Sequence, residues 1–259
     1  MCKRVAFVLL VVSALLSGRC VPQQGPFPPY PSPSPTAASA VTGHPTPTPQ
    51  PSPTPSPTPA PIPPPWIAEQ QTAMTREAQS DVLALDSLTR YDIDLSIGIE
   101  SLTLTGRQTT TYTNNSPQVL EDLYFNLFPN SSRFAASMEI GELSVDGVAR
   151  PFEYERQGAV AKVSLANPLA PGKTASVALD FTARVPHAQK NYYLVFVMAQ
   201  GVLSLGDWHP MVAVYDDQGW NLTYPEGTVG EVVFSQSAFY TVRLLLPQGL
   251  GLEVIATGV

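Results

Sequence analysis

The fold of this chain is decided by residues 91–116, YDIDLSIGIESLTLTGRQTTTYTNNS. Apolar side chains occupy every second position of its first part: Tyr91, Ile93, Leu95 and Ile97. Successive side chains of a strand point to opposite faces, so this period of two predicts a strand with one buried and one exposed face. A second strand is predicted at residues 109–113, before a turn at Asn114-Asn115-Ser116-Pro117.

Further short strands are expected to the end of the chain. They are residues 120–127, 142–145, 152–155, 160–165, 174–183, 238–246 and 252–256. Asp146-Gly147, Asn167-Pro168 and Pro171-Gly172 mark turns between them. This spacing predicts an all-β domain over residues 90–259, built as an antiparallel β-sandwich.

One short helix is predicted ahead of the strands, within residues 67–89. Proline and glycine disappear there, and apolar side chains recur at intervals of three and four residues: Met74, Ala78, Val82 and Leu85.

The first twenty residues carry an export signal. Lys3 and Arg4 precede an apolar run at residues 5–16, which is too short to span a bilayer and has the charge and length of a signal peptide. We therefore expect the protein to be exported.

Residues 16–20, LSGRC, resemble a bacterial lipoprotein cleavage box, in which Cys20 would become the lipidated first residue. Arg19 stands where that box normally has Gly, Ala or Ser, and the alternative is ordinary cleavage after Gly18. We favour lipidation because a lone cysteine directly after the apolar run has no other evident role. The expected location is the extracellular face of a bacterial cell membrane, through this lipid anchor.

Residues 21–66 form a linker rich in proline, serine and threonine. Nineteen of residues 21–65 are proline. Proline fixes φ and lacks an amide hydrogen, so the stretch is expected to be a disordered, extended stalk. A docking site for a proline-recognising domain and a glycosylated stalk are the alternatives.

Charge and cysteine content exclude several classes of function. All 21 acidic side chains but only 11 of the 14 basic ones lie beyond Trp66, so the folded part carries 11 − 21 = −10. Such a surface repels phosphate backbones, and we expect no nucleic acid partner. Cys2 and Cys20 both precede the domain, which leaves it no disulfide framework and no thiolate metal site.

Three stretches together resemble the N-terminal domain of the family M1 zinc aminopeptidases, which are related to aminopeptidase N. They are residues 91–116, residues 120–130 (LEDLYFNLFPN), and the pair LGDWHPMVAVYDDQGW at 205–220 and AFYTVRLLLPQGLGLEVIATG at 238–258. The resemblance implies a non-catalytic, saddle-like β domain that packs on a C-terminal, thermolysin-like peptidase domain and forms one wall of its active-site cleft.

In that family the zinc ion is bound by the following domain, through a His-Glu-x-x-His helix and a distant Glu. His44, His187 and His209 are the histidines of this chain, and none is followed by glutamate. A zinc hydrolase needs three protein ligands and a carboxylate base. We therefore expect no catalytic residue, metal ligand or cofactor in this chain, and expect the chain to be a fragment whose peptidase domain follows.

The family's N-terminal domain often supplies a Gln or Glu that contacts the substrate's α-amino group. Gln200 lies nearest to that place, and the resemblance implies a substrate contact there. The alternative is a polar residue in a turn.

Two further groups of residues suggest sites. The first, Asp207, His209, Asp216 and Asp217, is either a metal site or hydrolytic dyad, or a set of ordinary turn residues, which we favour because its spacing fits no known ligand motif. The second, Trp208, Tyr215 and Trp220, is either an aromatic platform for sugars or part of the core or a domain interface, which the resemblance favours. Asn130-Ser131-Ser132 and Asn221-Leu222-Thr223 are glycosylation sequons.

Two functional hypotheses result. The chain is either an accessory domain of a membrane-anchored aminopeptidase or a self-standing surface module that binds carbohydrate or protein. An accessory domain without its neighbour should expose an apolar patch and an unpaired strand at the C-terminal edge, which a free module would cover.

Overall fold

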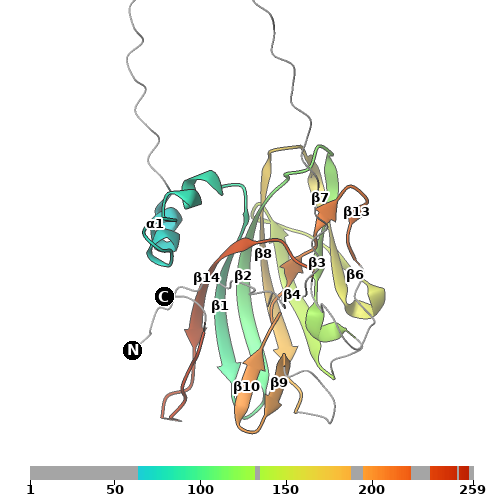
Figure 1. Ribbon diagram of the computed structural model, residues 1–259. Coiled ribbons are helices and arrows are strands. Elements are labelled where there is room, and N and C mark those ends of the chain that lie inside the picture. The colour runs from blue at the N-terminus through green and yellow to red at the C-terminus, as the bar shows by residue number, and fades with distance from the viewer. Residues whose placement is uncertain (1–63, 132–134, 188–194, 223–233, 250, 257–259) are drawn as a thin grey trace, which may run out of the picture. The chain divides into compact units, whose positions relative to one another are not determined.

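The computed structural model describes residues 64–131, 135–187, 195–222, 234–249 and 251–256 (Figure 1). These residues belong to one compact unit. The predicted signal peptide, Cys20 and almost all of the predicted stalk lie outside the described residues. Within the described ranges, no helix is long and apolar enough to cross a membrane.

The larger sheet has six strands in the order β14-β1-β2-β8-β4-β5. Their bounds are β1 Thr89–Gly98, β2 Thr103–Thr113, β4 Ser137–Val145, β5 Val148–Ala149, β8 Thr174–Arg184 and β14 Ala238–Leu245. Neighbouring strands are antiparallel except β1 and β14, which are parallel with Tyr91 opposite Tyr240. The sequence predicted only antiparallel pairing, so this parallel edge is a correction.

The second sheet has four strands in the order β11-β3-β7-β6, and two separate hairpins complete the β structure. Its strands are β3 Leu120–Asn126, β6 Phe152–Glu155, β7 Val160–Leu169 and β11 Met211–Val212. The hairpins are β9 Phe196–Ala199 with β10 Val202–Leu205, and β12 Tyr215–Asp216 with β13 Gly219–Trp220. Short 3₁₀ helices follow β3 (η2, Phe128–Asn130) and β6 (η3, Arg156–Gly158).

One hydrophobic core joins the two sheets, and this arrangement confirms the predicted all-β sandwich. Tyr91, Ile93, Leu95 and Ile97 are all buried, as their alternation predicts. Phe181 of β8 packs on Gly106 of β2, where a built Cβ would lie 2.2 Å from the ring. Any larger residue at position 106 would therefore displace the centre of the core.

The helical segment is shorter than predicted. It consists of α1 (Pro65–Thr72) and a 3₁₀ turn, η1 (Asp81–Ala84), with bends and turns between them. The Thr72 hydroxyl bonds back to the Glu69 carbonyl at 2.6 Å, which offers the backbone an alternative to continuing the helix. The segment still buries a satellite cluster of Ile67 and Val82 against Phe239 of β14.

Two local predictions were wrong. Residues 252–256 form no strand, although their sequence alternates as one should. Asn167-Pro168 was expected to be a turn but lies inside β7. Proline is tolerated at this place because β7 pairs with β3 across a bulge there, so the missing amide hydrogen breaks no regular ladder.

Candidate functional site

The segment that follows β10 carries polar residues into the core. Asp207 adopts a left-handed backbone conformation with φ of 50°, and Trp208, His209 and Pro210 are then buried. His209 is 1% exposed. It meets the centre of β2, where Gln108 and Thr110 are completely buried. Three polar side chains from two distant segments thus share one apolar interior.

Hydrogen bonds fix the protonation of His209. The Gln108 amide nitrogen Nε2 donates to the Pro210 carbonyl at 2.8 Å, which orients Gln108 Oε1 as an acceptor. His209 Nδ1 lies 2.9 Å from that oxygen and 3.0 Å from the Pro210 carbonyl oxygen. Since both neighbours accept, Nδ1 carries the hydrogen and Nε2 keeps a lone pair. Nε2 is buried, and no described residue bonds to it.

Burial also sets the charge of this cluster. It lowers the pKa of His209 to about 4, so the imidazole is neutral at pH 7. The rings of Tyr91 and Tyr240 lie 4.9 and 5.6 Å from that of His209. Burial, and secondly the charge of Asp207, raises the pKa of Tyr240. Burial raises the pKa of Asp207 itself to about 6. Between these two values the cluster is therefore mostly uncharged; Asp207 ionises as the pH rises through about 6, and His209 becomes protonated as it falls through about 4.

The four residues considered as a metal site do not come together. Asp216 and Asp217 are exposed at the β12–β13 hairpin, and Asp216 Oδ1 accepts from the Gln218 amide at 2.8 Å. No group of three or more His, Cys, Asp or Glu side chains in the described residues is placed to hold a metal ion. His187 is exposed. The favoured interpretation, ordinary turn residues, fits Asp216 and Asp217, whereas His209 is a core residue, which was not expected.

Gln200 lies at the tip of the β9–β10 hairpin. It is exposed with φ of 50°, and Gly201 follows with φ of 79°. Two successive residues of positive φ are typical of a tight two-residue hairpin turn. The turn role is evident in this geometry, and a contact with a substrate stays a prediction.

The three aromatic residues do not form a single platform. Trp208 is 8% exposed and packs in the core with its ring 6.2 Å from that of Phe181. Tyr215 and Trp220 are half-buried and meet edge to face at 5.1 Å. Trp220 also lies 5.5 Å from Tyr124 of β3. Trp208 therefore belongs to the core, which was one of the alternatives to a sugar-binding platform.

Sequence reasoning missed the residues that surround Trp220. Tyr124 lies beneath Lys162 of β7, whose Nζ is 5.9 Å from the ring centre and 3.3 Å from Asp122 Oδ2. The alternation along β3 contains the signal, because Asp122 and Tyr124 occupy the face opposite to buried Leu123 and Phe125. The sequence alone does not show that β3 pairs with β7, and it is this pairing that brings Lys162 opposite Tyr124.

The first sequon is a structural element. Asn130 Nδ2 donates to the carbonyl oxygens of Met138 and Gly158 at 2.8 and 2.7 Å, and its Oδ1 accepts from the Met138 amide at 2.5 Å. These bonds tie η2 to β4 and η3. Glycosylation of Asn130 would replace one Nδ2 hydrogen and so remove one of its two donor bonds.

The C-terminal edge of the larger sheet has an open strand edge and several exposed apolar side chains. Among the described residues β14 pairs only with β1. The Gln70 amide donates to the Tyr240 carbonyl at 3.0 Å, which shows that this carbonyl faces the outer edge. Alternation places the backbone groups of Val242 and Leu244 on the same edge. Four nearby apolar side chains are exposed, by 60% at Leu245, 42% at Leu252, 50% at Val254 and 91% at Ile255.

Comparison with known proteins gives a limited result. No family model and no curated protein matches this chain. Similar solved structures include an M1 zinc metallopeptidase from Deinococcus radiodurans, with 17% identity, TM-score 0.38, and coverage of 62% of this chain and 32% of that one. A two-domain M1 zinc metallopeptidase bound to L-tryptophan has 18% identity, TM-score 0.32, and coverage of 40% and 22%.

Native leukotriene A4 hydrolase from Saccharomyces cerevisiae gives 14% identity, TM-score 0.28, and coverage of 40% and 15%. The chain thus spans about a third or less of the length of these solved structures. Similarity at this level does not assign the chain to their family.

Proposed function

We propose that this chain is the non-catalytic N-terminal β domain of an exported, membrane-anchored M1-type zinc aminopeptidase. It packs on a catalytic domain outside these 259 residues. The sequence resemblance supports this proposal because its stretches, in their family order, fall on β1–β2, β3–η2 and the segments around β11 to β14 of one sandwich.

The observation that carries the proposal is the C-terminal edge. An eight-residue strand with an open edge beside four exposed apolar side chains is unfavourable in water. A neighbouring domain that covers Leu245 and residues 252–255 would remove that cost. This is the feature that distinguishes an accessory domain from a self-standing carbohydrate- or protein-binding module.

The described residues do not fit a zinc site. His209 has its Nδ1 hydrogen bonded and is enclosed by Tyr91 and Tyr240, while Asp216 and Asp217 lie on an exposed hairpin. Peptide hydrolysis is therefore assigned to the proposed catalytic domain. The role of this chain is to support that domain and one wall of its cleft.

The test begins with the coding DNA beyond Val259, and the purified chain is assayed for zinc and for hydrolysis of an aminoacyl anilide. The proposal expects a reading frame that continues into a His-Glu-x-x-His segment, and a 259-residue chain without zinc or activity. A true stop codon with an inactive chain would favour the binding module. Zinc-dependent cleavage by this chain alone would exclude both functions.

The longer protein then allows a test of the edge. Ile255→Asp should weaken the contact between the β domain and the catalytic domain. The segment that connects these two domains should then become more sensitive to protease. Val148→Asp, at the opposite edge and also exposed, is the matched control. Equal behaviour of the two variants would contradict the proposed interface.

A further inference from the structure

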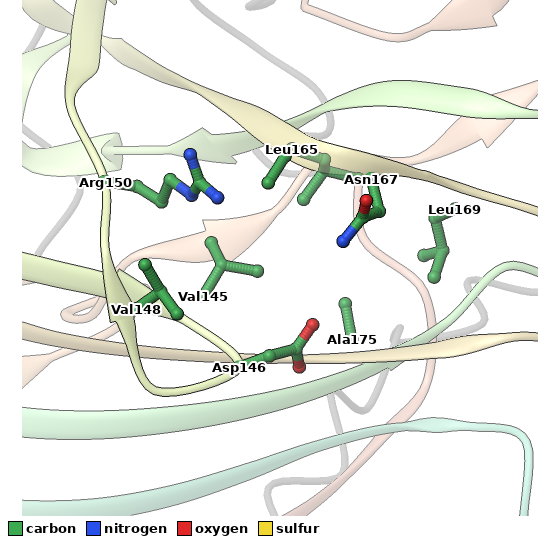
Figure 2. Close-up of a pocket in the computed structure, with 9 residues that line it drawn as sticks. Val145, Asp146, Val148, Arg150, Leu165, Asn167, Leu169 and Ala175 are labelled. Atoms are coloured by element: carbon green, nitrogen blue, oxygen red, sulfur yellow. The ribbon is translucent and has the colours of Figure 1, made fainter.

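A small cavity lies at one end of the sandwich, away from the C-terminal edge. It has a volume of about 90 Å³, is partly open to solvent, and is lined by the β4–β5 hairpin, the far half of β7 and the start of β8 (Figure 2). Val145, Leu169 and Ala175 line it with buried apolar groups. A buried water needs only about 10–15 Å³, so several waters or a ligand of a few heavy atoms can occupy it.

Arg150 is the cationic group of this cavity. Its backbone amide donates to the Leu143 carbonyl at 3.0 Å, which fixes the residue directly after β5. The guanidinium extends into the cavity in Figure 2. Its Nε is buried and has no hydrogen-bond partner among the described residues, and no described carboxylate forms an ion pair with it. Arg150 as a whole is part-exposed, but a buried guanidinium nitrogen without a partner is costly, which favours an acceptor such as an anionic group in the cavity.

Asp146 supplies a negative charge from another side. Its backbone amide donates to the Ser176 carbonyl at 2.8 Å, and its Oδ1 accepts from the Ser176 amide at 2.9 Å. These two bonds hold the residue in its turn conformation, with φ of 49°. In Figure 2 its carboxylate points toward the cavity and away from Arg150. The two charges are thus held apart.

Asn167 adds a neutral polar group. Because this residue lies in β7 and not in a turn, its side chain has a defined direction, and its amide points into the cavity in Figure 2. An amide offers two donors and an acceptor. The cavity therefore combines one cation, one anion and one amide over an apolar floor, with a net charge of zero.

We propose that this cavity binds a free α-amino acid with a small side chain, such as alanine or glycine. The ligand's carboxylate pairs with the Arg150 guanidinium and the Asn167 amide, its ammonium pairs with Asp146, and its side chain rests on Leu169 and Ala175. A simple anion would face the Asp146 carboxylate, and a simple cation would face Arg150. A zwitterion alone matches both charges. This inference is independent of the proposed aminopeptidase role.

The test is a titration of the full chain with L-alanine at pH 7, followed by calorimetry and by shifts of backbone amide NMR signals at residues 145–150 and 165–169. Glycinamide lacks the carboxylate and acetate lacks the ammonium group. We expect saturable binding of alanine and at least tenfold weaker binding of both analogues. Leucine, which exceeds the cavity, should also bind at least tenfold more weakly.

Three variants complete the test. Arg150→Met keeps the length of the side chain but not its charge, and should weaken alanine binding at least tenfold, while Arg184→Met on the exposed face of β8 should not change it. Asp146→Asn should raise acetate affinity relative to alanine. Equal binding of acetate and alanine by the unaltered chain would reduce the cavity to an anion site. Absence of saturable binding would leave it filled by water, and either result overturns the proposal.

Discussion

The two edges of the six-stranded sheet are protected in different ways. At one edge β5 has only two residues, and the chain then passes to β6 in the second sheet. This edge therefore offers little backbone for another strand to pair with. At the other edge β14 has eight residues, and among its outward-facing backbone groups a described hydrogen bond reaches only the Tyr240 carbonyl, from Gln70. The contrast shows that the β5 edge is protected by its own short length, whereas the β14 edge depends on added elements.

The largest expected effect comes from removing the contact between β14 and the helical segment. Phe239 is 7% exposed, packs with Ile67 and Val82, and has its ring 5.4 Å from that of Trp66. Phe239→Ala should lower the free energy of unfolding by about 3–5 kcal/mol, as in other buried Phe→Ala changes. Val148→Ala at β5, where the side chain is 56% exposed, should change it by less than about 0.5 kcal/mol. Urea denaturation measures both, and similar losses would refute the contrast.

A smaller effect is expected on the inner side of β14, where Asp207 lies near Tyr240. The raised pKa of Asp207, about 6, means that its contribution to stability is present below pH 4 and is lost as the pH rises through 6. The lowered pKa of His209, about 4, has the opposite sign, and its contribution is lost as the pH falls from 6.5 through 4. Each shift corresponds to about 3 kcal/mol, so the two nearly cancel between pH 4 and 6.

Asp207→Asn separates the two effects. The variant should be more stable than the unaltered chain at pH 7 by up to about 3 kcal/mol, and should lose that stability steeply on acidification because His209 remains. Unfolding free energies measured from pH 4 to 7 provide the check. Asp216→Asn, on the exposed hairpin, is the control. A variant with the same flat profile as the unaltered chain would contradict this assignment.

The single hydrogen bond at the β14 edge should have a modest effect. Gln70→Ala removes the donor to the Tyr240 carbonyl and should cost about 1 kcal/mol. Amide hydrogen exchange within β14 should accelerate more than exchange in β4. Gln71→Ala, which loses only an exposed bond to the Gln79 carbonyl, should leave both rates unchanged.

The smallest effect on stability is expected at the exposed end of the same edge. Ile255 is 91% exposed, so Ile255→Asp should change the free energy of unfolding by less than about 0.5 kcal/mol. It should nevertheless reduce binding of a hydrophobic dye and self-association, because it breaks the apolar patch. Sedimentation velocity at several concentrations measures the second effect, and an unaltered profile would show that the patch is not adhesive.

The sequence predicted the centre of the molecule better than its edges. Residues 91–97 alternate between apolar and polar because one face of the strand is buried. This pattern predicted β1 correctly. The pairing of β14 with β1 was not predictable, because parallel and antiparallel partners require the same alternation. Residues 252–256 have a strand-like pattern but no described partner, and pattern alone cannot supply hydrogen bonds.

The candidate sites show the same limit. The sequence placed Asp207 and His209 in one cluster, but their burial depends on the meeting of residues 207–210 with Gln108, a hundred positions earlier. Neither Arg150 nor Asn167 belongs to a recognisable motif in the sequence. They became a candidate site only because a hairpin and a strand converge on one cavity.

The parallel pairing of β1 with β14 also bears on folding kinetics. Arg243 of β14 binds Asp94 of β1 across 149 positions of sequence, so the outermost pair of strands in the sheet joins opposite ends of the domain. Closing so long a loop is entropically costly, and high contact order slows folding. While the chain is still being synthesised, β1 has β2 on one side and an open second edge. Until β14 arrives, that edge is where the nascent protein is most exposed to misassembly and where a holding chaperone would be most effective.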